Sequence, residues 1–355
     1  MELIQENKES LRGGGVRSSN IELFRILSML IIVAHHYVVN SGLWACIDAQ
    51  SNLHLQDYFL LFFGWGGKTG INCFVLITGY FMCTSNITKK KFCKLVGEVY
   101  FYNIIIWCLF FIIGYEQFSI KGLLKALFPF FTVADNFTSC FLLFYLLIPF
   151  INRLIHALTE KEHFLLMVWC LGVYVVLPSF AKANVVFNYV TWFAILFVIA
   201  SYIRLYPKAW FNSSKTTGIL AVVSLILSWI SIAVLAMISK RIGGTIGLAY
   251  FFVSDSNKVL ALTTAVNAFL FFRNLKLRNN KVINTVAAST FGVLLIHANS
   301  DAMRRWLWRD VCNNVAVYES GNVVGHAIGC VLLIYTVCTI IDIIRVKVFD
   351  LVWRQ

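Results

Sequence analysis

Residues 20–41, NIELFRILSMLIIVAHHYVVNS, indicate both the fold and the first candidate site. The stretch is long and apolar enough to cross a bilayer, yet it contains Glu22, Arg25, His35 and His36. Titratable side chains cost several kcal/mol at bilayer depth, so they persist mainly where they have a function. We therefore predict a membrane-spanning helix that carries functional groups.

Two of these groups, Arg25 and His36, are predicted to share one helix face. They are eleven positions apart, which is about three full turns and about 16 Å along an α-helix. We expect the Arg25 cation near the membrane surface, where it suits an anionic cofactor. We expect His36 near mid-depth, where an imidazole that titrates near neutrality suits a general base. His35 faces about 100° away, and it is expected to pack beside the site, to orient it or to contact a substrate.

The composition extends this prediction to the whole chain. Hydrophobic residues make up 59% of the 355 residues, charged residues make up 13%, and the mean hydropathy is +0.76. Such values exclude a soluble globular domain and are typical of an all-α, polytopic membrane protein. We expect about ten spans, at roughly 21–40, 58–84, 97–114, 127–151, 164–179, 188–204, 217–239, 255–272, 284–300 and 322–344. Pro129, Asp135 and Asn136 interrupt the fourth, so part of 116–139 is expected to be re-entrant or interfacial.

The net charge of +13 is explained by membrane orientation rather than by nucleic-acid binding. Predicted inner segments hold nineteen Lys and Arg residues, whereas predicted outer segments hold eight. The outer eight are Lys121, Lys125, Lys182, Lys240, Arg241, Arg304, Arg305 and Arg309. Because positive charges are enriched in cytoplasmic loops, we predict that the N-terminus and the C-terminus are both cytoplasmic.

We expect a single membrane domain over 20–345, with a disordered cytoplasmic lead at 1–19 and a short cytoplasmic tail at 346–355. No linker long enough to separate domains interrupts the apolar spans. Most of the ten cysteines lie within apolar segments, where a thiol behaves as a small hydrophobe. The sequence has no CxxC motif and no Cys/His ligand spacing, so no metal site is predicted.

A second candidate site combines the span at 71–83 with the basic run that follows it. Gly79, inside that span, predicts close approach of a neighbouring helix. The run at 89–94, KKKFCK, is by default an anchor for phospholipid headgroups. Its functional interpretation is a binding patch for the phosphates of a cytoplasmic cofactor, whose candidate ligands are Lys90, Lys91 and Lys94. The last two share one face if the run is helical.

A third candidate site lies at 291–309, FGVLLIHANSDAMRRWLWR. His297 is at the outer end of the predicted ninth span, and Asp301 is expected one helical turn onward. By default, the arginines and tryptophans that follow form a belt at the membrane interface. Their functional interpretation is an outward-facing site for a sugar, with Trp306 as a stacking surface. Lys68, at the outer mouth of the second span, is a further candidate.

Taken together, these motifs resemble the acyltransferase family 3 membrane proteins. The resemblance is carried by Arg25-x10-His36 in the first span, by Phe-x-x-x-x-Gly-Tyr-Phe at 74–81 and by the basic run at 89–94. FLLFYLLIPFINRLI (141–155) and FGVLLIH (291–297) further resemble bacterial glycan O-acetyltransferases of that family. The motifs are short, but their order and spacing are specific, and the resemblance runs from about residue 20 to about residue 345.

The resemblance implies a ten-helix domain that passes an acyl group, usually acetyl, from cytoplasmic acyl-CoA to a hydroxyl of a cell-envelope glycan. The family's catalytic histidine corresponds to His36, and its paired arginine corresponds to Arg25. Many members carry Arg-x-x-Arg after the second span, where this chain has Lys91-x-x-Lys94. Lysine binds phosphate as a point charge and lacks the planar, bidentate fork of arginine.

We therefore expect an O-acetyltransferase of a bacterial plasma (inner) membrane, with acetyl-CoA as co-substrate and without a metal. The acceptor is expected to be a surface polysaccharide or its lipid-linked precursor, and membrane lipids are the other expected partners. The residues expected to act on the donor are Arg25, Lys90, Lys91 and Lys94, and those expected to contact the acceptor are His35, Lys68, His297, Asp301 and Trp306. His36 either deprotonates the sugar hydroxyl or transiently carries the acyl group, and the sequence leaves both open.

Two other classes of protein fit parts of the sequence. A transporter of polysaccharide or lipid-linked glycan also explains aromatic outer loops and an internal histidine, and it predicts substrate movement without CoA chemistry. A membrane sensor or scaffold leaves the pairing of Arg25 with His36 unexplained. The sequence leaves the oligomeric state, the glycan and the acylated hydroxyl open.

Overall fold

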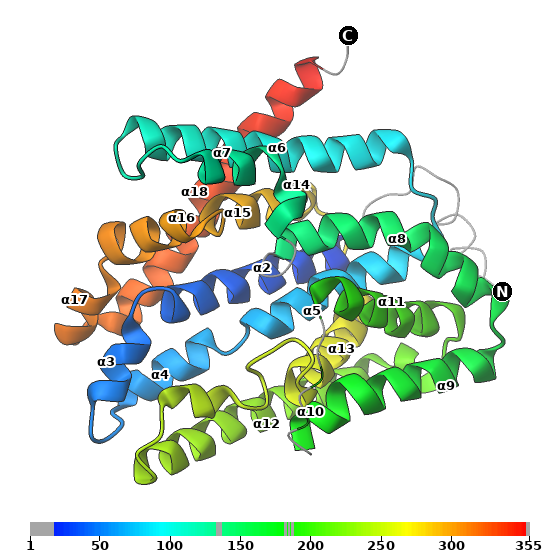
Figure 1. The fold of residues 1–355 in the computed structure, drawn as a ribbon. Helices are drawn as coiled ribbons and strands as arrows, with labels where there is room; N and C mark the ends of the chain where they lie inside the picture. The colour runs from blue at the N-terminus through cyan, green and yellow to red at the C-terminus, as the bar shows by residue number, and fades with distance from the viewer. Residues whose placement is uncertain (1–17, 133–136, 181–182, 184, 186–187, 353–355) are drawn as a thin grey trace.

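The computed structural model describes residues 18–132, 137–180, 183, 185 and 188–352 (Figure 1). Helices are the only regular secondary structure among these residues, which confirms the predicted all-α class. Up to residue 180 they are α2 (Ser19–Val39), α3 (Leu43–Ala49), α4 (Leu55–Gly64), α5 (Gly67–Met82), α6 (Lys89–Ile112), α7 (Ile120–Leu127), η1 (Pro129–Thr132), α8 (Phe137–Ala157), α9 (Glu160–Leu171), η2 (Gly172–Val176) and α10 (Leu177–Phe180). From residue 188 they are α11 (Tyr189–Leu205), η3 (Ala209–Asn212), α12 (Ser214–Arg241), η4 (Ile246–Tyr250), α13 (Val259–Asn274), α14 (Lys281–Ala288), α15 (Thr290–His297), α16 (Asp301–Arg305), η5 (Trp306–Val311), α17 (Asn314–Glu319) and α18 (Val323–Val352).

Several of these helices can cross a membrane. Within the described ranges, the seven stretches that are long and apolar enough are Ser19–Val39, Leu55–Met82, Lys89–Ile112, Phe137–Ala157, Glu160–Phe180, Ser214–Arg241 and Val323–Leu351. Lys281–His297 and Asp301–Glu319, bent by 94°, make an eighth if the pair is one broken span. The apolar helices α11 and α13 are shorter, with 17 and 16 residues, and lie where two further spans were predicted. The chain is a multi-pass membrane protein, and the count of ten stays a prediction.

The largest difference from the predicted spans is at the fourth one. Its predicted bounds, 127–151, are wrong, because α8 begins at Phe137 and continues past Pro149 to Ala157. The segment before it forms the separate short helix α7 and the 3₁₀ helix η1, so the predicted interruption is confirmed, and its re-entrant or interfacial position stays a prediction. Asp135 and Asn136 lie outside the described residues, as do Lys182 and residues 1–17 of the predicted lead.

Two other helices extend beyond the spans predicted for them. The helix α6 starts at Lys89, where the side chain of Thr88 accepts a hydrogen bond from the Lys91 backbone N–H (3.3 Å). The basic run therefore forms the first turns of a helix, and Lys91 and Lys94 do share a face. The helix α18 continues to Val352, so the described part of the predicted tail is helical, and its end projects from the bundle in Figure 1.

The surface of α12 identifies the side that faces lipid. Its exposed residues are large and apolar and follow a helical stripe that includes Ile219, Val222, Ile226 and Ile230. Its buried side is built from small and hydroxyl-bearing residues such as Ser224. This arrangement is the reverse of a soluble helix, and small residues at helix–helix contacts are typical of membrane bundles.

At the centre of the bundle, α5 packs against α2, α11 and α13 (Figure 1). Gly79 permits the contact with α11, since a Cβ there would lie 2.9 Å from the Cβ of Ala200 and 3.1 Å from the Cα of Phe197. The predicted close approach at Gly79 is thus confirmed. Gly67, at the other end of α5, lies against α2 so closely that a Cβ would overlap the imidazole of His35. The packing of α5 on α2 therefore fixes the position of the first candidate site.

Candidate active site

A cavity of about 1170 Å³ lies beside the second half of α2. Its wall is formed by α2, α5, α6, α7, η1, α8, α11, α15 and α16, so segments far apart in the sequence meet around it. Its deep part is apolar and includes Met29 and Phe74, whereas the exposed residues Gln117, Lys121 and Lys125 mark a polar mouth. Such a cavity can enclose a sizeable ligand and present polar groups to it.

His36 is half-buried in the wall of this cavity and pairs with a second histidine. Its Nδ1 lies 3.0 Å from Nε2 of His297, and Nδ1 of His297 lies 2.6 Å from the carbonyl oxygen of Val293. A carbonyl only accepts hydrogen bonds, so Nδ1 of His297 carries a hydrogen, and in the neutral ring its Nε2 is an acceptor. His36 must then donate from Nδ1. This leaves Nε2 of neutral His36 as a basic nitrogen without a hydrogen, which is the form that a general base requires.

The structure places His36 in the last turn of α2, where its carbonyl oxygen accepts the backbone N–H of Asn40 (3.1 Å). His36 therefore lies near the end of this helix, and its depth in the bilayer stays a prediction. His35 also lines the cavity beside His36. Its Nδ1 lies 2.6 Å from the Gly64 carbonyl oxygen. By the same logic, His35 donates to that carbonyl and is held in one orientation.

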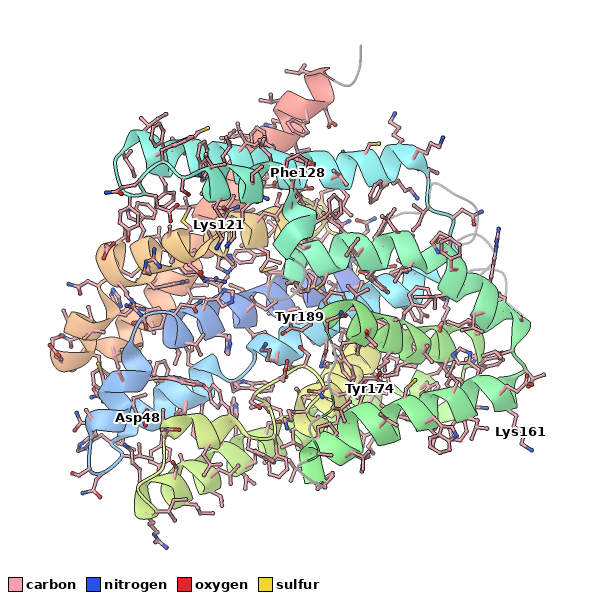
Figure 2. The ribbon with its side chains drawn as sticks, viewed as in Figure 1. Asp48, Lys121, Phe128, Lys161, Tyr174 and Tyr189 are labelled. Atoms are coloured by element: carbon pink, nitrogen blue, oxygen red, sulfur yellow. The ribbon has the colours of Figure 1, made fainter. Side chains whose placement is uncertain are left out.

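Lys68 lines the cavity at the start of α5. Its predicted place at the mouth of the second span is wrong, because Leu55–Met82 forms one candidate span and Lys68 lies at its middle. Its Nζ donates to the hydroxyl of Tyr189 (2.5 Å) and lies 3.5 Å from a carboxylate oxygen of Asp255. Figure 2 shows Tyr189 at the start of α11, beside this end of α5. The Asp255 carboxylate balances the Lys68 charge, so Lys68 is a held cation beside the histidines rather than a mobile surface group.

Asp301 and Arg304 lie at the mouth of the cavity and form an ion pair with each other. Asp301 does not continue the helix of His297, because the chain bends by 94° there and Ser300 starts α16 by accepting a hydrogen bond from the Met303 N–H (3.1 Å). The predicted position one turn onward is therefore wrong. Both residues nevertheless reach the same cavity, His297 through its contact with His36.

Tyr115 completes the mouth from the loop between α6 and α7. Its hydroxyl donates to a carboxylate oxygen of Asp310 (2.5 Å). This hydrogen bond raises the pKa of the Tyr115 phenol above its ordinary value, so the phenol stays protonated and neutral near pH 7.

The tryptophans of the third candidate site do not line this cavity. The ring of Trp306 packs edge-on against Phe110, with centroids 5.7 Å apart. Trp308 is fully buried and packs edge-on against Tyr37, with centroids 5.8 Å apart. Neither residue forms an interfacial belt around the outside of the bundle. Trp306 can affect a ligand only through Phe110, which does line the cavity.

The residues predicted to bind a cofactor lie outside the cavity. Lys90, Lys91 and Lys94 are exposed at the start of α6, and Lys94 Nζ lies 3.9 Å from Asp350 of α18. Arg25 is partly exposed, with its Nε 3.9 Å from Glu22. However, Arg25, Met29, Ile32 and His36 are spaced i, i+4, i+7 and i+11, so they share one face of α2. Since Met29 lines the deep part of the cavity, Arg25 lies about 6 Å beyond it along that face.

A buried ionic cluster between α6 and α18 was missed by the sequence analysis. Arg345 lies 2.8 Å from Asp342 and 3.0 Å from Glu98, and Tyr102 donates to Asp342 (2.8 Å). Asp342 is fully buried, and Arg345 is 4% exposed. The rule that drew attention to Glu22 and His36, a titratable side chain inside an apolar span, would also have found Glu98 and Asp342.

The described residues contain no group of three or more His, Cys, Asp or Glu side chains that could hold a metal ion.

The fold and the site define a multi-pass helical membrane protein with an oriented histidine at an internal cavity. The chain belongs to acyltransferase family 3, since the family model described as an acyltransferase domain matches residues 18–343. The protein is therefore a membrane acyltransferase, and the resemblance seen in its motifs is confirmed. No curated protein and no solved structure matches the chain.

Proposed function

We propose that this acyltransferase moves an acetyl group from cytoplasmic acetyl-CoA to a hydroxyl of a surface polysaccharide or of its lipid-linked precursor. The single observation that supports this most strongly is the His36–His297 pair, which presents a basic nitrogen at the cavity. A base in that form suits acyl transfer to an alcohol, because an alcohol is a poor nucleophile until its proton is removed.

In the proposed reaction, Nε2 of His36 takes the proton of the acceptor hydroxyl. The hydroxyl oxygen then attacks the thioester carbonyl carbon, a C–O bond forms and the C–S bond breaks. The CoA thiolate leaves and takes up the proton from His36, so the histidine is regenerated. Direct transfer requires no covalent acyl-enzyme, and we prefer it because His36 has one nitrogen committed to His297 and one available for the proton.

The donor is proposed to enter from the side of Arg25 and the basic run. Arg25, Lys90, Lys91 and Lys94 supply cations for the phosphates of CoA, and the face of α2 from Arg25 through Met29 gives the pantetheine arm a path to His36. The acceptor is proposed to enter at the opposite, polar mouth and to contact His35, Lys68 and Asp301. Trp306 acts indirectly by supporting Phe110.

The proposed orientation has both termini in the cytoplasm of a bacterial cell and ten spans in its plasma (inner) membrane. The distribution of Lys and Arg, nineteen against eight, supports this orientation. It puts the basic run on the same side as the soluble CoA pool, and it puts the mouth with Lys121 and Asp301 on the side of the cell-surface glycan.

The test of this function is acetyl-CoA binding and turnover by the purified protein in detergent micelles, with radiolabelled acetyl-CoA. We expect saturable binding, slow release of acetate in the absence of acceptor, and transfer of label when a glycan acceptor is added. A folded protein that binds no acetyl-CoA would overturn the proposal and would leave glycan transport as the better explanation.

Replacing Lys91 and Lys94 with alanine is expected to raise the apparent KM for acetyl-CoA about fivefold to tenfold, with little change in kcat. Each exposed charge contact contributes a factor of about two to five. The control is Lys161→Ala with Lys215→Ala, two exposed lysines of other helices that remove the same charge. An equal rise of KM in both double variants would show that only overall charge matters, and an unchanged KM in the first would remove these lysines from the donor site.

His297 is expected to act as a positioning residue for His36. His297→Leu removes the acceptor of the His36 Nδ1–H, so kcat should fall about 10²-fold while KM for acetyl-CoA changes little, since the base loses its orientation and tautomer. His297→Gln keeps an acceptor oxygen and should recover much of the loss. If the two variants lose activity equally, the hydrogen bond is not what His297 contributes.

A further inference from the structure

The short helix α7 has its charged side at the mouth of the cavity, where both of its lysines remain exposed. Lys121, Gly122, Lys125 and Ala126 all line the cavity, and the i, i+4 spacing of the two lysines puts both on that one face. The neighbouring face, about 100° away from the lysines, carries Ile120 and Leu124, which are 70% and 44% exposed. Figure 2 labels Lys121, which belongs to α7, and α7 packs against α6.

This orientation argues against a role of the lysines as anchors for lipid headgroups. Anchoring lysines extend away from the bundle toward the membrane surface, whereas these two, although exposed, line the mouth of the cavity, and the apolar residues Ile120 and Leu124 are the ones that lie off the cavity wall. Among the described residues, neither lysine forms an ion pair within 4 Å. Lys125 does act electrostatically on the carboxylate of Asp301, but that carboxylate is already paired with Arg304. Most of the charge of the two lysines is therefore available to a ligand at the mouth.

The other charged groups of the cavity wall leave this excess positive. Arg304 is paired with Asp301, and Lys68 is paired with Asp255. Glu116 is the remaining carboxylate of the described wall, so it offsets one of the two α7 lysines at most. Cations that line one side of a cleft focus its electrostatic field on entering anions.

The lysines also lie at the wrong end of α6 to serve the phosphates of the donor. The basic run occupies the first turns of α6, whereas the cavity wall begins at Asn103 and continues to Phe110. Nine residues separate Lys94 from Asn103, which is about 14 Å of helix. Donor phosphates held by the run and an acceptor held by α7 would therefore approach His36 from different ends.

We propose that the acceptor is an anionic glycan and that Lys121 and Lys125 select it by its carboxylate or phosphate groups. This inference rests on the proposed function and specifies its substrate class. The acidic group binds at the α7 lysines while a neighbouring hydroxyl reaches His36. The acidic group is therefore recognised by the enzyme but does not itself react.

The test is direct binding of a pair of glycans that differ only in charge, without acetyl-CoA. A galacturonic acid hexasaccharide is compared with its methyl-esterified form by calorimetry, on the intact protein in uncharged detergent. We expect the acidic form to bind at least fivefold to tenfold more tightly, and added salt should reduce the difference. A phosphorylated mannan oligosaccharide and its dephosphorylated form, measured in the same way, distinguish phosphate from carboxylate.

The decisive variant is Lys121→Gln with Lys125→Gln, which should remove the preference for the acidic form and leave binding of the neutral form unchanged. The control is Lys161→Gln with Lys215→Gln, which removes equal charge from exposed positions outside the cavity wall. In the view of Figure 2, Lys161 projects from the far edge of the molecule, well apart from Lys121. The control should keep the preference.

Three results would overturn the proposal. Neither anionic probe binds more tightly than its neutral form, or the α7 variant keeps the preference, or that variant instead raises the KM for acetyl-CoA and assigns the lysines to the donor. Because binding is measured without acetyl-CoA, failure here is distinguishable from failure of the acetyl-CoA turnover test, which requires no glycan.

Discussion

Replacing His36 with alanine is expected to lower acetyl transfer by about 10²-fold to 10⁴-fold, which is the usual contribution of a positioned general base. The reason is geometric as well as chemical. His297 and the Val293 carbonyl commit one nitrogen of His36, and they hold the ring so that its other nitrogen is left for the proton. Acetyl-CoA binding should persist, because the proposed phosphate contacts are on other residues.

The measurement is acetyl-CoA binding and turnover on the same preparations of wild type and variant. A matched control is His156→Ala, since His156 is an exposed histidine whose Nδ1 contacts only a carbonyl of its own helix (2.8 Å). The control should keep full activity. If His36→Ala keeps full activity in a folded protein, His36 is not the base. If it loses acetyl-CoA binding as well, the loss of turnover cannot be assigned to proton transfer.

Replacing Arg345 with methionine is expected to destabilise the protein by about 3–5 kcal/mol, the usual cost of removing one partner from a buried ion pair. Methionine preserves much of the side-chain volume, so the change is mainly electrostatic. It leaves the Asp342 and Glu98 carboxylates close together in the interior without their shared cation. A stability curve in denaturant, measured in micelles, would detect a loss of this size.

The control on the same helix is Lys347→Met, which removes the same charge from an exposed position two residues away and should change stability by less than about 1 kcal/mol. Combining Arg345→Met with Asp342→Asn and Glu98→Gln should recover much of the lost stability, because no uncompensated carboxylate then remains. Equal losses in the single and triple variants would mean that packing, and not charge, makes Arg345 important.

The sequence allowed the first span, the histidine in it and the cationic start of α6 to be predicted, because titratable groups stand out against an apolar background. The pairing of His36 with His297 could not be predicted in the same way. The two are 261 positions apart, and their contact depends on how α15 packs beside α2. The order and periodicity of residues in one sequence do not show which helices pack side by side.

The misplaced elements have local physical causes. The bend after His297 follows from Ser300, a residue type that commonly caps helix starts, so the sequence itself contains a signal for a new helix there. The start of α8 was predicted too early, since the apolar residues around Pro129 belong to a separate 3₁₀ turn. Periodicity alone does not distinguish such a turn from the first turn of a span.

The cavity accompanies α2 from Met29 to Asn40, eleven residues or about 16 Å, roughly half the apolar thickness of a bilayer. In the proposed reaction, a cavity of this depth means that only the acetyl group has to cross the membrane. CoA stays on its own side, the glycan stays on the other, and only a two-carbon fragment changes compartments. The helix bundle then does not have to alternate between inward-open and outward-open conformations, as a transporter of whole sugars must. One rigid arrangement of helices can serve every turnover.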